Sequence, residues 1–177
     1  MRLGLVTIAL CTSLVHSAEI LPDVQRFHSY SPTLAISGQP KREQFPIIAR
    51  AGYRTVVNVA SNDSNPDAIR EEKQLVEAAG MEYHYIPLSW EKPDLAQVVA
   101  AAKLLRQLEG TPTLVHCYIG SRASLVAYLY RVNYSGAAEV EERTTLTQLW
   151  GLNRGYELRN SPQWQAVLEN TRAVLGK

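Results

Sequence analysis

Two patterns of hydrophobic residues occur along the chain, and they predict where the strands and helices lie. Short apolar, β-branched runs bounded by turn residues are typical of buried strands, whereas apolar residues three and four positions apart are typical of a helix with one buried face. Strands are therefore expected at residues 34–36, 55–59, 83–86 and 113–116. Helices are expected at residues 41–50, 68–79, 94–108, 123–134, 137–150 and 162–175.

The order of these elements predicts the fold class. A strand, a helix and a further strand, repeated at this spacing, form parallel βαβ units with helices on both faces of a sheet. We expect an α/β fold of three layers with a central, mostly parallel sheet of four to five strands. Glu71 and Glu72 lie in the early part of the helix at residues 68–79, where acidic side chains favour the helix dipole. Ligands of such sheets bind at the carboxyl ends of the strands, which is where Cys117 falls.

Residues 1–18 have the features of a secretory signal peptide. Arg2 is followed by an apolar run at residues 3–15, and the segment ends in the small residues Ser17 and Ala18. The run is shorter than the roughly 20 apolar residues of a helix that spans a membrane, so we expect no membrane anchor. The sequence therefore predicts cleavage after Ser17 or Ala18, a periplasmic or secreted protein, and one domain at residues 19–177.

Charge and cysteine content narrow the function further. The chain has 18 Lys and Arg residues against 17 Asp and Glu residues, so no strongly basic surface is expected to bind nucleic acid or a membrane. Of the two cysteines, Cys11 leaves with the signal peptide, and Cys117 then has no partner for a disulfide within the chain. We expect no cofactor and no metal site.

Residues 113–124 place Cys117 between a predicted strand and the start of a predicted helix. The loop after the cysteine presents its backbone N–H groups at a helix N-terminus, and such a place attracts anions. These N–H groups and Arg122 favour the thiolate form of Cys117, which is the nucleophilic form. Cys117 could instead be an ordinary core cysteine. The presence of Gly120, Arg122 and Ser124 within eight residues of it favours a chemical role.

The segment from His116 to Ser124 resembles the active-site loop of the cysteine-dependent protein phosphatases. Their usual loop places five residues between Cys and Arg, whereas four separate Cys117 from Arg122 here, and Ala123 occupies the usual arginine position. Rhodanese sulfurtransferases share the shorter spacing, as does the bacterial phosphatase-like family named after beta-lactamase hydrolase-like proteins. Most of the chain after the signal peptide resembles this second family. The motifs that carry the resemblance are Ser-Gly-Gln-Pro at residues 37–40, Ala-Gly-Tyr at 51–53, Val-Val-Asn at 56–58 and Arg-Ala-Ser at 122–124.

The resemblance implies a protein tyrosine phosphatase-like fold and the hydrolysis of phosphate monoesters. In that reaction the Cys117 thiolate attacks phosphorus and forms a cysteinyl-phosphate, which water then hydrolyses. His116 would orient the loop, and Ser124 would donate a hydrogen bond to the sulfur and help it to leave. The residues expected to bind the phosphate are Tyr118, Ile119, Gly120, Ser121 and Arg122.

Phosphatases of this type also need a general acid, which they take from an aspartate in the loop after the preceding strand. Members of the family often have Asp-Phe where this chain has Ser89 and Trp90, so the expected acid is replaced. Asp94 is our first candidate, although it also suits the cap of the helix at residues 94–108, and Glu91 is the second. Asp63 and Asp67, in the loop after an earlier strand, are weaker candidates.

Two other functions stay open at this point. A rhodanese-like sulfurtransferase uses the same short loop and needs no general acid, and a non-catalytic phosphate- or sulfate-binding module would also tolerate Ser89. The phosphatase hypothesis implies a phosphorylated substrate, whether protein, nucleotide or lipid.

Overall fold

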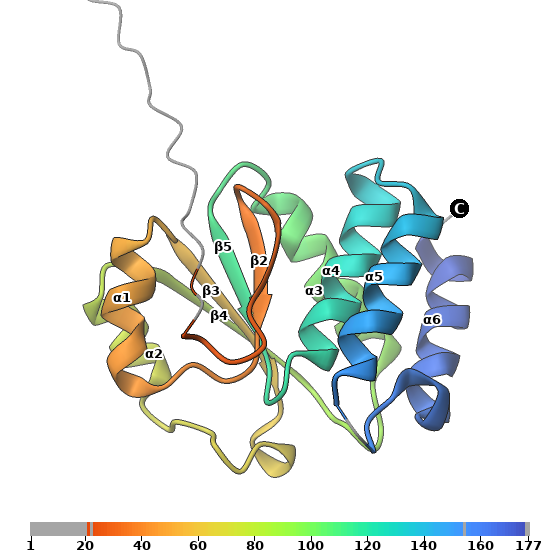
Figure 1. Cartoon of the computed structure of the whole chain (residues 1–177), viewed down its shortest axis with the longest axis horizontal. Coiled ribbons are helices and arrows are strands. Elements are labelled where there is room, and N and C mark those ends of the chain that lie inside the picture. The colour runs from red at the N-terminus through yellow and green to blue at the C-terminus, as the bar shows by residue number, and fades with distance from the viewer. Residues whose placement is uncertain (1–20, 22, 154, 176–177) are drawn as a thin grey trace, which may run out of the picture.

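A five-stranded sheet forms the centre of the molecule in the computed structural model, which describes residue 21, residues 23–153 and residues 155–175 (Figure 1). The strands lie in the order β1-β2-β5-β3-β4. Their bounds are β1 His28–Ser31, β2 Leu34–Ser37, β3 Thr55–Ala60, β4 Glu82–Leu88 and β5 Thr113–His116. The predicted signal peptide at residues 1–18 lies outside the described residues.

The sheet is mixed but mostly parallel. β2, β5, β3 and β4 run in the same direction, and β1 pairs antiparallel with β2 at one edge. β5 lies in the middle of the parallel part, and His116 at its end is level with Ser37 of β2 and Asn58 of β3. The carboxyl ends of three parallel strands therefore meet around the residue that precedes Cys117, and the predicted α/β fold class is confirmed.

Helices cover both faces of the sheet, as Figure 1 shows. α1 and α2 lie on one face, over a core that includes Phe45, Val56 and Leu114. α3, α4, α5 and α6 lie on the other face, over a larger core that includes Val115 and Leu125. The α-helices are α1 Phe45–Arg50, α2 Glu72–Ala78, α3 Leu95–Gln107, α4 Ser121–Tyr134, α5 Glu139–Gly151 and α6 Pro162–Leu175. Short 3-10 helices occur at η1 Arg42–Gln44, η2 Asn62–Ser64 and η3 Leu158–Asn160.

Three local differences from the expected elements have simple causes. β1 was not expected, because its sequence His-Ser-Tyr-Ser lacks an apolar run and the strand is held at the sheet edge by backbone pairing. α1 is shorter than residues 41–50, since Pro46 stands in its first turn and a 3-10 helix precedes it. α2 begins only at Glu72, because residues 61–71 form η2 and a series of turns. Within the described part of the chain, no helix is both long enough and apolar enough to cross a membrane.

Candidate active site

Cys117 lies directly after β5 and before the N-terminus of α4. Its side chain is fully buried, and its sulfur accepts a hydrogen bond from the backbone N–H of Gly120, with 3.2 Å between nitrogen and Sγ. Gly120 has a φ of 88°, a left-handed conformation that favours glycine, and an added Cβ would lie 3.4 Å from the Cβ of Arg26. The tight turn that directs an N–H group at the sulfur therefore depends on the glycine.

Backbone and side-chain hydrogen bonds hold this loop from several directions. The N–H of Cys117 donates to the carbonyl of Ser37 at 3.3 Å, and the carbonyl of Tyr118 accepts from the backbone N–H of Gln39 at 3.0 Å. On the helical side, Asn153 Nδ2 donates to Ser121 Oγ at 3.0 Å. The conformation of the loop is thus fixed by the end of β2 and by the chain after α5.

A pocket of about 520 Å³ opens over the loop at the carboxyl ends of the parallel strands. This is the position at which ligands bind in sheets of this kind. Its floor is formed by Cys117, Tyr118, Ile119, Ser121 and Arg122, and its walls by Asn62, Ser64, Asn65, Pro66, Ser89, Trp90, Glu91 and Tyr156. The predicted nucleophile and four of the five residues predicted to bind phosphate therefore line one cavity.

Arg122 lines the pocket although only 2% of its surface is exposed. Its Nη1 donates to the carbonyl of Leu88 at 2.7 Å and to Ser64 Oγ at 2.9 Å. Its guanidinium also lies 6.0 Å from the centroid of the Trp90 ring. Ala123, at the position where the longer phosphatase loops carry arginine, is fully buried in the apolar core. The shorter loop therefore turns residue 122, and not residue 123, towards the pocket.

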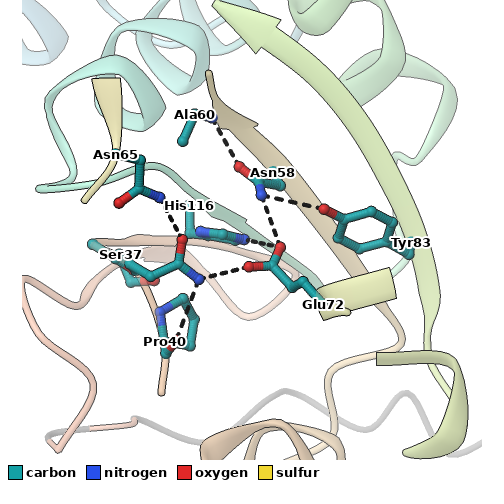
Figure 2. Close-up of polar contacts among 10 residues, drawn as sticks. Ser37, Pro40, Asn58, Ala60, Asn65, Glu72, Tyr83 and His116 are labelled. Atoms are coloured by element: carbon teal, nitrogen blue, oxygen red, sulfur yellow. Dashed lines mark hydrogen bonds and ion pairs between the residues drawn. The ribbon is translucent and has the colours of Figure 1, made fainter. Parts of the chain in front are cut away.

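A buried polar network lies beneath the loop (Figure 2). His116 Nε2 and Glu72 Oε1 are 2.9 Å apart, and neither side chain is more than 3% exposed. The carboxylate of Glu72 also accepts from Asn58 Nδ2 at 2.8 Å and from Gln39 Nε2 at 2.6 Å. Because a carboxylate can only accept, Nε2 of His116 must carry the proton in this contact.

The network changes the acidity of two of its members. Burial by itself raises the pKa of Glu72, but the electrostatic effect of His116 and the hydrogen bonds from His116, Gln39 and Tyr83 outweigh burial and lower it. Burial and the nearby Glu72 carboxylate raise the pKa of Tyr83. Glu72 is therefore held as a carboxylate inside the protein, and Tyr83 is held as a neutral phenol.

Ser124 is fully buried, and its hydroxyl has two partners. It donates to the carbonyl of Ser121 at 2.8 Å, and it accepts from Trp150 Nε1 at 3.2 Å. Both bonds fix the first turn of α4, which carries Arg122.

The candidate acids occupy different positions around the site. Asp94 is the N-cap of α3, where its Oδ1 accepts from the backbone N–H of Ala96 at 2.8 Å, and it does not line the pocket. Glu91 does line the pocket, next to Ser89 and Trp90. Asp63 belongs to η2, and Asp67 is exposed and lines a separate cavity together with Gln39. Among the described side chains, no group of three or more His, Cys, Asp and Glu residues is placed to hold a metal ion.

Sequence reasoning missed the central member of the buried network. Glu72 has the sequence context of an ordinary acidic residue in the first turn of a helix, and only the fold brings it to His116, 44 positions away. A partial signal was present, because Gln39 and Asn58 belong to the Ser-Gly-Gln-Pro and Val-Val-Asn motifs. Polar residues at the ends of buried strands are the signal that could have pointed to these two members of the network.

Comparison with known proteins identifies the family of the chain. Residues 26–133, more than half of the chain, match the model of the beta-lactamase hydrolase-like protein, phosphatase-like domain family. The chain belongs to this family. A beta-lactamase hydrolase-like protein of Xylella fastidiosa is 30% identical to it over 133 residues, which are 74% of this chain and 30% of that protein. The chain thus spans less than a third of the length of this curated relative.

Solved structures place the family in a wider fold group. A candidate phosphatase of the DUF442 family from Shewanella putrefaciens CN-32 is 34% identical, with a TM-score of 0.74 over 87% of this chain and 93% of that one. A mutant form of Tk-PTP is 18% identical, with a TM-score of 0.64 over 84% of this chain and 95% of that one, a likeness of fold alone. The family member described here therefore has a protein tyrosine phosphatase-like fold.

Proposed function

We propose that this protein is an exported, cysteine-dependent phosphatase that hydrolyses phosphate monoesters through a cysteinyl-phosphate. The observation that carries the proposal is the placement of Cys117 and Arg122 in one pocket, at the N-terminus of α4. The N–H of Gly120 points at the sulfur at 3.2 Å, as expected of a loop that stabilises an anion at this position. The membership in a phosphatase-like family supports the same reaction class.

The first step forms a bond between Cys117 Sγ and phosphorus and breaks the ester bond between phosphorus and the leaving oxygen. The negative charge on the remaining phosphate oxygens is balanced by loop N–H groups and by the guanidinium of Arg122. In the second step water attacks phosphorus, the bond to sulfur breaks, and inorganic phosphate and the Cys117 thiolate are released.

Glu91 is the proposed general acid. It lines the pocket with Cys117, whereas Asp94 is engaged as the cap of α3. Glu91 would give its proton to the leaving oxygen in the first step and take a proton from the attacking water in the second. This cycle returns every group to its starting state.

One observation favours the sulfurtransferase alternative. Ser89 stands on the pocket wall at the position where the family resemblance implies an aspartate. A sulfurtransferase would carry a persulfide on Cys117 and would need no general acid. Both functions use Cys117 as the nucleophile, so only the substrate that the protein turns over can distinguish them.

A turnover assay with p-nitrophenyl phosphate tests the proposal. The parent protein is expected to hydrolyse the ester and to be inhibited by vanadate, and Cys117→Ser to lose measurable turnover, because a hydroxyl is a far weaker nucleophile than a thiolate. Thermal unfolding of Cys117→Ser at the parent temperature serves as the control for folding. Undiminished hydrolysis in the serine variant would overturn the mechanism, and transfer of sulfur from thiosulfate to cyanide without phosphatase activity would favour the alternative.

Export is a separate part of the proposal and rests on the character of residues 1–18. Mass spectrometry of the protein recovered from the envelope fraction should show a chain that begins at Ala18 or Glu19. An intact N-terminus, or a lipid on Cys11, would contradict this localisation.

A further inference from the structure

We propose that Glu72 is a positioning residue. It fixes the positions of the segments that follow β2, β3 and β5 around Cys117. The inference rests on the proposed function, in which Cys117 is the nucleophile. Glu72 comes from α2, on the opposite side of the sheet from α4, and does not line the pocket (Figure 1). Its effect on the reaction must therefore pass through the residues that it binds.

Burial and full pairing distinguish Glu72 from an ordinary surface acid. It is 2% exposed, and its two oxygens accept from Gln39, Asn58 and His116 at 2.6 to 2.9 Å, beside a further hydrogen bond from Tyr83. A buried carboxylate is tolerated only when hydrogen bonds replace the water that it has lost. Gln39 and Asn58 donate through uncharged amide groups, and His116 donates through its imidazole N–H. The strength of these bonds depends on their distance and direction, so a small displacement weakens them.

Each of these three donors stands at or near the end of a different parallel strand. His116 ends β5, Asn58 lies near the end of β3, and Gln39 follows β2 by two residues. The pairing of β5 with its neighbours sets His116 level with Asn58 and with Ser37. One carboxylate thus binds the ends of the three central strands at once.

The same donors are also bonded to the segments that form the pocket. Gln39 Oε1 accepts from Nδ2 of Asn65, a pocket residue, at 2.7 Å, and the backbone N–H of Gln39 donates to the carbonyl of Tyr118. Asn58 Oδ1 accepts from the backbone N–H of Ala60 at 2.8 Å, where the chain leaves β3 for the pocket wall. His116 is adjacent to Cys117 itself. The bonds from Gln39 and His116 to Glu72 are therefore one contact away from pocket residues, and the bond from Asn58 leads to Ala60, two positions before the pocket residue Asn62.

The imidazole of His116 depends on this carboxylate in particular. Its Nδ1 is buried and has no hydrogen-bond partner among the described residues, so Nε2 makes the one side-chain contact that orients the ring. Without the carboxylate, the imidazole N–H would be left unpaired beneath Cys117. The two amide groups would keep only their longer contacts, from Gln39 Nε2 to the carbonyl of Pro40 at 3.3 Å and from Asn58 Nδ2 to the hydroxyl of Tyr83 at 3.2 Å. They would be expected to rearrange, and the loop above them would move with them.

Glu72→Gln tests the inference, because it keeps the shape of the side chain but removes the charge and replaces one acceptor oxygen by a donor. Glu71→Gln is the matched control, since Glu71 is the preceding residue, is half-exposed and pairs with Arg42 outside the network. Turnover with p-nitrophenyl phosphate, hydrogen exchange by mass spectrometry and thermal unfolding are measured for both variants and the parent.

For Glu72→Gln we expect kcat to fall roughly 10- to 100-fold with KM within about threefold of the parent, because misplacement of a nucleophile by a fraction of an ångström acts on the chemical step. Amide exchange should become faster in residues 37–40, 60–65 and 116–120 and stay unchanged in α6, whereas a merely structural role would raise exchange throughout the protein. Glu71→Gln should match the parent in every measurement.

If Glu72→Gln folds and matches the parent in both turnover and exchange, the inference is wrong. If Glu72→Gln does not fold, Gln39→Leu takes its place, since it removes one donor and leaves those of Asn58 and His116 in place. Unchanged turnover and exchange in that variant would also overturn the inference. An inactive parent protein would refute the proposed function instead, and the exchange pattern, which needs no activity, would still decide the role of Glu72.

Discussion

The two sides of the Cys117 loop are built from opposite kinds of contact. Beneath the loop lies the buried polar network, whose members are Glu72, His116, Gln39, Asn58, Asn65 and Tyr83. Beside it lies an aromatic cluster of Trp90, Trp150, Trp164 and Tyr156, which contains all three tryptophans of the chain. Trp90 is at its centre, with ring centroids 5.3 to 5.8 Å from those of the other three.

This difference determines what each side can tolerate. In the polar network each bond has one donor and one acceptor in a fixed direction, so a small change in charge or length leaves a buried group unpaired. In the aromatic cluster the stabilisation comes from buried area and ring contacts, which depend on volume and hardly at all on pH. We therefore expect substitutions beneath the loop to affect the chemistry, and substitutions beside it to affect the stability of the fold.

The largest expected effect is on the aromatic side. Trp164 is fully buried, and its Nε1 donates to the carbonyl of Trp90 at 3.1 Å. Trp164→Ala should lower the free energy of unfolding by about 4 kcal/mol through the cavity that it leaves, with the same loss at pH 7 and pH 5. Trp164→Phe, which fills most of the cavity, is the control and should lose much less. Urea unfolding measures both, and a loss that varies with pH would show that the two sides are not independent.

The next effect concerns Arg122, which contacts Trp90 of the aromatic cluster and donates to Ser64 and to the carbonyl of Leu88. Arg122→Lys keeps the charge but loses the planar fork that binds phosphate through two parallel bonds. We expect the activation barrier to rise by about 3 kcal/mol, a loss of roughly a hundredfold in kcat. Arg106→Lys, at an exposed arginine of α3, is the matched control. If Arg122→Lys turns over saturating substrate within about threefold of the parent, Arg122 is not the residue whose guanidinium binds the phosphate oxygens.

Restoring the spacing of the longer loops should not rescue Arg122→Lys. Ala123 is fully buried in the core, so Ala123→Arg would place a charge among apolar side chains. We expect this variant to lose stability without gaining turnover, and recovery of activity in the double variant would contradict the position assigned to residue 122.

A smaller effect on the free energy of unfolding is expected in the polar network, and unlike that of the aromatic cluster it should depend on pH. The pKa of Glu72 is lower in the folded protein than its ordinary value of 4.5, so its charged form stabilises the fold above that pH, and this stabilisation is lost as the pH falls through the lowered pKa. Glu72→Gln should reduce the free energy of unfolding by about 2 kcal/mol at pH 7. The difference from the parent should narrow below pH 4.5. Urea unfolding from pH 7 to pH 3 tests this, and a constant difference would contradict it.

Hydrophobic periodicity predicted the aspects of the structure that depend on local sequence. The apolar runs around Val57 and Val115 are central parallel strands, and the loop that opens with Cys117 lies where the pattern placed it. What periodicity could not predict depends on contacts between distant segments. Glu72 has the same local context as Glu71, yet one is buried beneath the site and the other is half-exposed, because only the position of α2 against the sheet separates them.

The same limit explains why the sequence alone did not identify which of two carboxylates in one loop is the general acid. Asp94 and Glu91 are three positions apart, and both suit an acid in sequence. The structure uses Asp94 to cap α3, a role that depends on an oxygen and not on a negative charge. Whether a carboxylate is needed at each position is therefore a question that amide substitutions can answer.

The smallest expected effect is that of Asp94→Asn. Asparagine caps a helix about as well as aspartate, so the free energy of unfolding should change by less than about 0.5 kcal/mol. Turnover should stay within about threefold of the parent, since Asp94 lies outside the pocket, whereas Glu91→Gln should lose on the order of a hundredfold in kcat if it removes the acid. Steady-state rates of the two variants, measured together from pH 5 to pH 8, decide between the residues. A large loss in Asp94→Asn with none in Glu91→Gln would mean that the loop at residues 89–94 moves when substrate binds, releasing Asp94 from the helix to act as the acid.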